Sequence, residues 1–306
     1  MNAGETPVRS RTSEVGRFLE IQTLGLNLPF ALAFLFLAAR GVPSLLTLVL
    51  VLVAFVAARN AGHSFNRWAD RRYDAANPRT RGRALVTGRL SPSFALVLTS
   101  VNAAILLGAS YLLNPLAFVL APVALAILLG YSYSKRITAL TTPLLGLVQA
   151  IIPAATYIAV RGSLPPVVLL AVGGLLAWGT AFETIHSMGD VESDRALGLF
   201  SLPQRLGPGP SLWLVVGLHA VALVLLASFG FALGLGGPYY AGLGVMALVA
   251  AVSDARLARE PARVRVPFER HFVMAAAFLV GVLVSVFVPA VGALPGGTLS
   301  AIAPPS

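Results

Sequence analysis

Residues 43–74 read PSLLTLVLVLVAFVAARNAGHSFNRWADRRYD, an almost wholly apolar run that ends in an amide and two carboxylates. The apolar part, 43–65, is long enough to cross a bilayer as a helix. In the polar part, Asn66, Asp70 and Asp74 recur at a four-residue spacing. Because an α-helix turns once per 3.6 residues, these side chains would lie along one stripe roughly 12 Å long. The stretch predicts a membrane helix that carries a row of oxygen ligands at one end.

The whole chain is unusually apolar. Of its 306 residues, 57% are hydrophobic and only 11% are charged, whereas soluble domains carry about 25% charged residues. Within a bilayer only helices and closed barrels satisfy their backbone groups, and long apolar runs favour helices. The sequence predicts nine spans, at residues 20–39, 43–65, 92–112, 115–133, 141–160, 166–188, 210–230, 238–255 and 270–290. We therefore expect an all-α, polytopic membrane protein that forms a single integral membrane domain over residues 1–306.

Lysine and arginine are concentrated on one side of these spans. The N-terminal tail (1–17) and alternate connections hold 19 of the 22 basic residues; these connections are 66–91, 134–140, 189–209 and 256–270. By the positive-inside rule, the tail and these loops face the cytoplasm, and residues 289–306 form a flexible outer tail. The net charge of +10 follows from this bias and from attraction to anionic lipid, so no nucleic-acid partner is expected.

A second acidic stretch, ETIHSMGDVESDRALG at residues 183–198, repeats the pattern of the first. His186, Asp190 and Asp194 have the same four-residue spacing. Glu183 lies seven residues before Asp190, on the same face of a helix. Both stripes lie at the cytoplasmic end of a predicted span, and four spans separate them. The sequence thus predicts two similar four-helix halves, with a ninth helix added, around a central cavity at their junction.

Aspartates that converge from two stripes would repel one another, so a cationic partner is expected. Mg²⁺ prefers carboxylate oxygens and commonly binds through one or two carboxylates together with phosphate oxygens. Two facing stripes would hold two ions, with an anionic phosphate ligand between them. The alternative, interfacial acids that simply pair with nearby arginines, is less favoured because two matching stripes occupy equivalent positions. A transition-metal site at His63 and His186 is not expected, because the chain has no cysteine and oxygen ligands dominate.

Basic side chains near these acids could bind the phosphate groups. Arg79 and Arg83 lie in the loop after the first stripe, and a guanidinium group matches phosphate oxygens in bidentate geometry. We assign Arg81 and Arg89 of the same loop to membrane topology instead. Lys135, the only lysine of the chain, follows two tyrosines at the same membrane face. It is a further candidate phosphate ligand, and the alternative is an ordinary interfacial anchor.

Three stretches resemble the motifs of the UbiA-type intramembrane aromatic prenyltransferases. NRWADRRYD is similar to the family's N-x₃-D-x₃-D motif, GDVESD to its second D-x₃-D motif, and YSYSKR to its Y-x-x-x-K loop. The first region looks closest to the bacterial 4-hydroxybenzoate-polyprenyltransferase-like group, some members of which are assigned to menaquinone formation. The resemblance covers nearly the whole chain. It implies transfer of a polyprenyl group from a polyprenyl diphosphate to an aromatic acceptor in menaquinone or ubiquinone biosynthesis.

The resemblance also implies roles for individual residues. The implied catalytic residues, which would bind two Mg²⁺ ions and the diphosphate, are Asn66, Asp70, Asp74, Asp190 and Asp194. Direct contacts with the diphosphate are implied for Arg79, Arg83 and Lys135. Arg136 would lie near the acceptor. The polyprenyl chain would lie in an apolar cavity open to membrane lipid.

The acceptor end of the pocket departs from the family pattern. Many relatives carry Asp where this chain has Glu183, and Tyr where it has His186. Arg59 lies seven residues before Asn66, on the same helix face and about 10 Å deeper. A lone arginine inside a span is a functional candidate. We expect it either to pair with Glu183 or to receive the carboxylate of the acceptor, unless its side chain reaches the headgroups along its own helix.

Other functions remain open on the sequence alone. The same fold could use another acceptor, namely haem, chlorophyllide, homogentisate or a glyceryl phosphate. A cation-coupled secondary transporter with an inverted repeat is the alternative from another class of protein. Transporters often have broken helices at mid-membrane, whereas the acids of this chain cluster at one membrane face. The sequence therefore favours the transferase.

Overall fold

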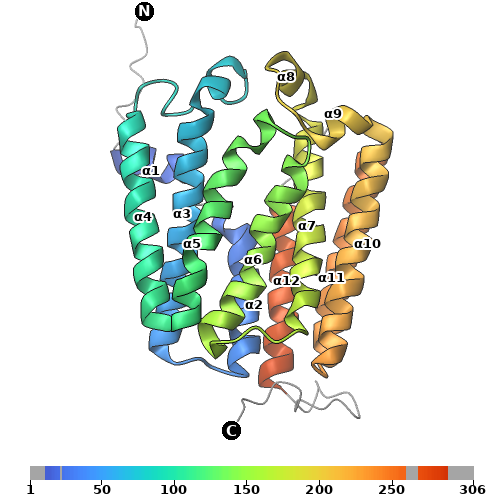
Figure 1. Ribbon diagram of the computed structural model, residues 1–306. Helices are drawn as coiled ribbons and strands as arrows, with labels where there is room; N and C mark the ends of the chain where they lie inside the picture. Colours follow the sequence, from blue (N-terminus) through green and yellow to red (C-terminus); the bar gives the residue numbers. More distant parts are fainter. Residues whose placement is uncertain (1–10, 21–22, 260–267, 289–306) are drawn as a thin grey trace, which may run out of the picture.

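The computed structural model describes residues 11–20, 23–259 and 268–288, and within these ranges every regular element is a helix. The predicted outer tail, 289–306, lies outside the described residues. Long helices run between the two ends of a single bundle (Figure 1). They are α2 (Leu24–Ala39), α3 (Leu45–Ala76), α4 (Pro92–Leu113), α5 (Pro115–Gly130), α6 (Thr141–Arg161), α7 (Val168–Met188), α10 (Pro208–Ala232), α11 (Gly237–Arg259) and α12 (Phe268–Phe287). The short elements are α1 (Arg11–Phe18), η2 (Tyr131–Arg136), α8 (Val191–Ala196) and α9 (Leu202–Leu206).

The protein is an integral membrane protein. In the part of the chain that the structure describes, eight helices are long and apolar enough to cross a membrane. The first predicted span, 20–39, corresponds to α2, which has only 16 residues. A helix of that length rises about 24 Å, less than the roughly 30 Å of a hydrocarbon core. The predicted count of nine full spans is therefore not confirmed, although nine long helices occupy the predicted positions.

The first acidic stripe lies on one unbroken helix, as its spacing predicts. α3 has 32 residues and continues from the apolar run through the whole of NRWADRRYD to Ala76. Its N-cap residue is Ser44, whose side chain accepts a hydrogen bond from the backbone N–H of Thr47 at 3.1 Å. Such a cap satisfies one of the free N–H groups of the first turn. The polar end of α3 is thus an extension of the membrane helix.

The second acidic stretch does not lie on one helix, and the prediction of a continuous stripe there is wrong. α7 ends at Met188 and α8 begins at Val191. The N–H groups of Gly189 and Asp190 donate to the carbonyls three residues earlier, at 3.1 and 3.2 Å. This is the hydrogen-bond pattern of a 3₁₀ turn, so the α-helix ends here. Glycine is a poor helix former, and Gly189 follows the last residue of α7. The break separates His186 from the two aspartates.

The helices form a ring that closes on itself. α3 packs against α4, α6 against α7, α7 against α10, and α11 against α12. α12 then packs against α2, and α2 against α6. A buried apolar core joins α2, α7, α10, α11 and α12, and it includes Phe34, Leu175, Phe229 and Phe278. On α7 this core uses residues 168–178. Nearer its end, α7 buries Ala181 and Ile185 in a second apolar cluster and turns Glu183 and His186 toward the cavity.

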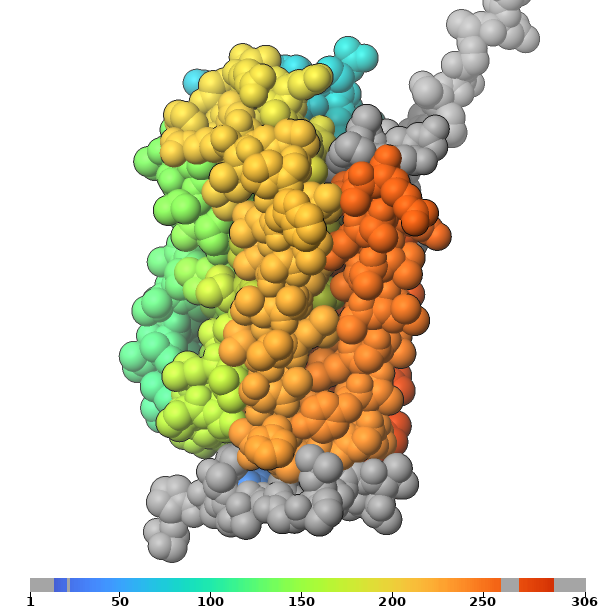
Figure 2. All heavy atoms as spheres, turned by 90° about the vertical axis from the view of Figure 1, so that its right-hand side faces the viewer, coloured from blue at the N-terminus to red at the C-terminus, as the bar shows by residue number. Residues whose placement is uncertain are grey.

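The outer face of the ring is apolar. Figure 2 views the side covered by α10 and α11, which pack side by side. Large side chains such as Trp213, Val224 and Leu248 are exposed on these helices. In a soluble protein a patch of this extent would be an interaction site, and on a membrane helix it is the surface that contacts lipid tails.

Candidate active site

A cavity of about 1880 Å³ lies at the end of the bundle where α3 and α7 terminate. Ten of the residues predicted for the site line it: Asn66, Asp70, Asp74, Arg79, Arg83, Lys135, Glu183, His186, Asp190 and Asp194. Arg59 and Arg136 are not among the lining residues. Residues from both halves of the chain, more than 100 positions apart, therefore meet around one space.

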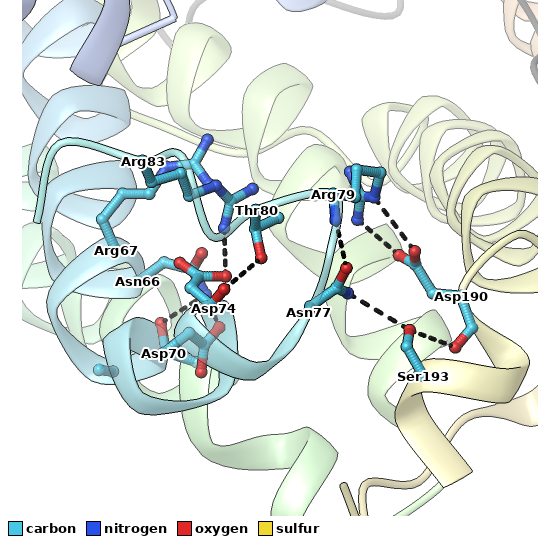
Figure 3. A network of polar contacts seen from close by, with 12 residues as sticks. Asn66, Arg67, Asp70, Asp74, Asn77, Arg79, Thr80, Arg83, Asp190 and Ser193 are labelled. Carbon is cyan, nitrogen blue, oxygen red and sulfur yellow. Dashed lines mark hydrogen bonds and ion pairs between the residues drawn. The ribbon is translucent and has the colours of Figure 1, made fainter. Parts of the chain in front are cut away.

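The first acidic stripe is held by its own helix and by the loop that follows it (Figure 3). Nδ2 of Asn66 donates to Oδ2 of Asp70 at 2.9 Å, one helical turn away. Nη1 of Arg83 donates to Oδ1 of Asp74 at 2.5 Å. The hydroxyl of Thr80 donates to the backbone carbonyl of Asp74 at 3.0 Å. The loop after α3 thus folds back over the stripe and brings its arginines to the cavity.

The same loop also contacts the second acidic stretch (Figure 3). Nε and Nη2 of Arg79 donate to Oδ1 and Oδ2 of Asp190 at 3.2 and 2.7 Å, which is the bidentate geometry of a strong arginine–carboxylate pair. Nδ2 of Asn77 donates to Oγ of Ser193 at 3.3 Å. These contacts join the loop after α3 to α8, so the two acidic stretches face each other across the cavity.

Asp194 has the least exposed side chain of the four aspartates that line the cavity, at only 6%. Its Oδ2 has no hydrogen-bond partner, and Nζ of Lys135 lies 3.9 Å away. Burial raises the pKa of Asp194 above its ordinary value, against the opposing effect of the Lys135 ammonium group. The fold therefore disfavours the ionised carboxylate in the absence of a cation.

Each of the four aspartates lies next to a basic side chain; the pairs are Asp70–Arg136, Asp74–Arg83, Asp190–Arg79 and Asp194–Lys135. The sequence analysis gave acids that simply pair with nearby arginines as the alternative to a cation site, and such ion pairs are present. No three His, Asp or Glu side chains of the described residues are close enough to form a ready-made cation site. The donor set nevertheless fits Mg²⁺, because carboxylate and amide oxygens line one cavity and Oδ2 of Asp194 is buried without a hydrogen-bond donor.

The short helix η2 links the two acidic stretches. Arg136, at its end, donates from Nη2 to Oδ1 of Asp70 at 3.2 Å and to the carbonyl of Ala69 at 2.8 Å. Lys135 points instead to Asp194, and its backbone carbonyl accepts from the N–H of Phe200 at 2.8 Å. Two consecutive residues thus contact opposite sides of the site.

Glu183 and His186 line the cavity from the end of α7. Oε1 of Glu183 accepts from the hydroxyl of Ser187 at 3.3 Å. Nδ1 of His186 lies 2.9 Å from the carbonyl oxygen of Phe182, and the ring centroids of these two residues are 4.2 Å apart. Because a carbonyl can only accept, Nδ1 carries the proton and Nε2 is the basic nitrogen of this imidazole.

Arg59 does not pair with Glu183, so that part of the sequence prediction is wrong. Its guanidinium donates to the carbonyls of Leu19 and Glu20, at 2.7 and 2.9 Å, and to the hydroxyl of Thr23. These acceptors belong to the N-terminal segment, which crosses the same face of α3. The physical reason is proximity: the carbonyls of Leu19 and Glu20 lie beside the guanidinium, whereas Glu183 lies on α7.

Sequence reasoning missed several polar contacts. Arg67, on α3, forms an ion pair with Glu20. His219 and Asp254 form a buried pair, with Nδ1 of the imidazole 2.9 Å from Oδ2 of the carboxylate. A polar residue in an otherwise apolar run is the signal that could have drawn attention to His219. Its partner on another helix could not be identified from spacing.

A scan of family models matches residues 27–268 to the UbiA prenyltransferase family. Two curated relatives are both called 4-hydroxybenzoate octaprenyltransferase. The chain is 32% identical to the protein of Alcanivorax borkumensis over 212 residues, which are 69% of this chain and 73% of the relative. It is 33% identical to that of Aeromonas salmonicida over 230 residues, which are 75% of this chain and 78% of the relative.

Solved structures show the same fold. The apo structure of a UbiA homolog from Aeropyrum pernix K1 has a TM-score of 0.76 and 31% identity, over 88% of this chain and 98% of that one. A UbiA homolog from Archaeoglobus fulgidus, bound to GPP and Mg²⁺, has a TM-score of 0.71 and 20% identity, over 89% and 99%. The second likeness concerns the fold alone.

Proposed function

The chain belongs to the UbiA prenyltransferase family and is a prenyltransferase, and on that premise we propose that it transfers a polyprenyl group from a polyprenyl diphosphate to a phenolic aromatic acid in quinone biosynthesis. 4-Hydroxybenzoate is the first acceptor to test, because the relatives of 32–33% identity are called 4-hydroxybenzoate octaprenyltransferases. The acid-lined cavity faces the cytoplasm in this proposal, as the distribution of basic residues predicts.

One observation carries the proposal: the two acidic stretches and the predicted phosphate ligands Arg79, Arg83 and Lys135 line a single cavity. A diphosphate needs cations around it and a prenyl chain needs an apolar channel, and a site at the end of a membrane bundle supplies both. A UbiA homolog of this fold binds GPP and Mg²⁺, which agrees with the oxygen-only donor set of Asn66, Asp70, Asp74, Asp190 and Asp194. Two bound ions would balance the four carboxylates.

The reaction breaks the allylic C–O bond, and both electrons leave with the diphosphate. Arg79, Arg83 and Lys135 hold the diphosphate and stabilise the charge that develops on it. To do so, each of these basic side chains gives up its contact with an aspartate and binds phosphate oxygens instead. When bound, Mg²⁺ supplies Lewis-acid stabilisation of the leaving group. The aspartates hold the cations and the helices of both halves exclude water, which would otherwise quench the carbocation.

The aromatic acceptor lies near Glu183 and His186 in this proposal. A ring carbon attacks the allylic carbon, a C–C bond forms, and the ring then loses one proton to diphosphate or water. The imidazole of His186 lines this part of the cavity, and we place it against the phenolic hydroxyl of the acceptor. Holding both substrates in one cavity supplies much of the reduction of the barrier.

Purified full-length protein in nanodiscs tests the proposal. It is given Mg²⁺, geranylgeranyl diphosphate and a panel of acceptors: phenolic acids, naphthoic acids, homogentisate and a glyceryl phosphate. We expect release of diphosphate together with a prenylated phenolic acid identified by its mass. Asp70→Asn and Asp190→Asn are expected to abolish turnover while the protein still inserts and folds.

Full activity of either variant, or of the wild type with excess chelator, would exclude the cation site. A prenylated product with only a non-phenolic acceptor would change the assigned acceptor and keep the reaction type. Movement of labelled substrate across proteoliposomes without release of diphosphate would favour the transporter. The variant Asp254→Asn, which alters a buried pair outside the cavity, controls for unspecific loss of activity.

A further inference from the structure

The guanidinium group of Arg136 lies close to two tyrosine rings. Its Cζ is 5.0 Å from the ring centroid of Tyr73, on α3, and 4.7 Å from that of Tyr133, on η2. Both distances are within the range of cation–π attraction. A planar guanidinium can stack between two rings while it donates hydrogen bonds from its edge, and a lysine ammonium cannot. Attraction to both rings therefore helps to hold the guanidinium of Arg136 where it presents its N–H groups.

The edge of Arg136 points at Asp70. Nη2 donates to Oδ1 of Asp70 and to the carbonyl of Ala69, and Asn66 donates to Oδ2 of the same carboxylate. Each oxygen of Asp70 thus has one protein donor. Since a carboxylate oxygen has two lone pairs, one site on each oxygen is left for a cation. The orientation of the carboxylate is set by these two neighbours before any ion binds.

Arg136 does not line the cavity and neither does Tyr133. A residue that binds the acceptor directly would have to reach that space. Arg136 near the acceptor stays a prediction; its contacts in the structure go to α3 and to the two rings. Its position is that of a support behind a cation ligand.

We propose that Arg136, held by its contacts with the rings of Tyr73 and Tyr133, is a positioning residue that orients the carboxylate of Asp70 for cation binding. The proposal rests on the proposed function, in which Asp70 is a cation ligand. Removing a supporting partner of a metal ligand commonly weakens metal affinity 10- to 100-fold. Removing one of the two rings while keeping the arginine should also weaken cation affinity, but by a smaller factor.

The test uses Tyr133→Leu, which removes the ring, and Tyr133→Phe, which keeps it. We expect Tyr133→Leu to raise the Mg²⁺ concentration for half-maximal rate about three- to tenfold, while the KM of the acceptor stays unchanged. Tyr133→Phe should restore the wild-type Mg²⁺ dependence, and Arg136→Lys should resemble Tyr133→Leu or exceed it. Tyr111→Leu, at an exposed tyrosine of α4, controls for loss of an aromatic ring elsewhere.

A second measurement does not depend on turnover. Mn²⁺ is titrated into the purified protein with inorganic diphosphate, and the free ion is followed by electron paramagnetic resonance. Tyr133→Leu is expected to weaken Mn²⁺ binding by the same factor as it shifts the Mg²⁺ dependence. If Tyr133→Leu instead raises the acceptor KM, or leaves Mn²⁺ affinity unchanged, Arg136 is not a positioning residue for Asp70. A wild-type protein that binds no Mn²⁺ and transfers no prenyl group contradicts the proposed function itself.

Discussion

The substitution Asp194→Asn should separate the stability of the protein from its ability to bind a cation. The carboxylate is nearly enclosed, its Oδ2 has no hydrogen-bond partner, and burial raises its pKa. A raised pKa means that the folded protein binds the proton more tightly than the unfolded chain does. The free energy of unfolding therefore falls as the pH rises through the interval between the unfolded and the folded pKa, and it stays lower above that interval.

Once it is ionised, the carboxylate thus reduces stability, and the uncharged amide of Asn removes that cost. We expect the cation-free variant to melt at the wild-type temperature or above it. The bound state behaves differently. A ligand at 100 times its Kd stabilises a protein by about 2.7 kcal/mol. If Asn weakens cation affinity about 100-fold, the stabilisation at the same concentration falls to about 0.4 kcal/mol.

The assay is thermal unfolding of the detergent-solubilised protein with and without Mg²⁺ and inorganic diphosphate. A chain of this size gains about 2–4 °C per kcal/mol, so we expect a ligand-induced rise of about 5–10 °C for the wild type and about 1–2 °C for Asp194→Asn. The wild-type rise should increase with pH as Asp194 loses its proton. The control Asp254→Asn should melt lower and keep the full rise, because it weakens a buried hydrogen bond worth about 1 kcal/mol.

Two results would refute this reasoning. If Asp194→Asn shows the same ligand-induced rise as the wild type, Asp194 does not bind the cation. If the cation-free variant melts several degrees lower, the carboxylate stabilises the fold through contacts that its unpartnered Oδ2 does not reveal.

Two further predictions concern the loops around the cavity. Because the chain has no cysteine, the double variant Asn77→Cys, Ser193→Cys can be cross-linked cleanly. We expect a short bifunctional thiol reagent to join the loop after α3 to α8 in the ligand-free protein, and neither single variant to react in this way. Absence of the intramolecular product on digestion would mean that the loops do not face each other in solution. Arg59→Met should free the N-terminal segment and speed tryptic cleavage after Arg17, measured by gel electrophoresis. Unchanged cleavage with a higher acceptor KM would show instead that Arg59 serves the acceptor.

Part of the site could be predicted from the sequence because it depends on local geometry. Asn66, Asp70 and Asp74 are one turn apart on a continuous helix, so their alignment follows from the helical repeat alone. The second acidic stretch has the same spacing, but Gly189 ends the helix and the alignment is lost. A spacing argument assumes a continuous helix, and whether the helix continues depends on what the chain packs against at that point.

Contacts between distant residues could not be predicted in the same way. Arg136 seemed from its motif to lie near the acceptor, and its hydrogen bonds go to Asp70 and Ala69. Arg59 seemed free to reach the cavity, and it donates to the carbonyls of Leu19 and Glu20. A guanidinium has five donors and a long side chain, so several acceptors lie within its reach, and the choice among them depends on how the helices are placed.

The sequence by itself determined the class of fold and the chemical character of the site. Long apolar runs have to become helices in a bilayer because their backbone groups have no water to bond with, and aspartates on those helices have to gather at a polar end. Only the tertiary structure decided which base accompanies each aspartate and which residues reach the cavity. Those contacts join residues far apart in the chain, and their free energies depend on distances that the packing of the helices sets.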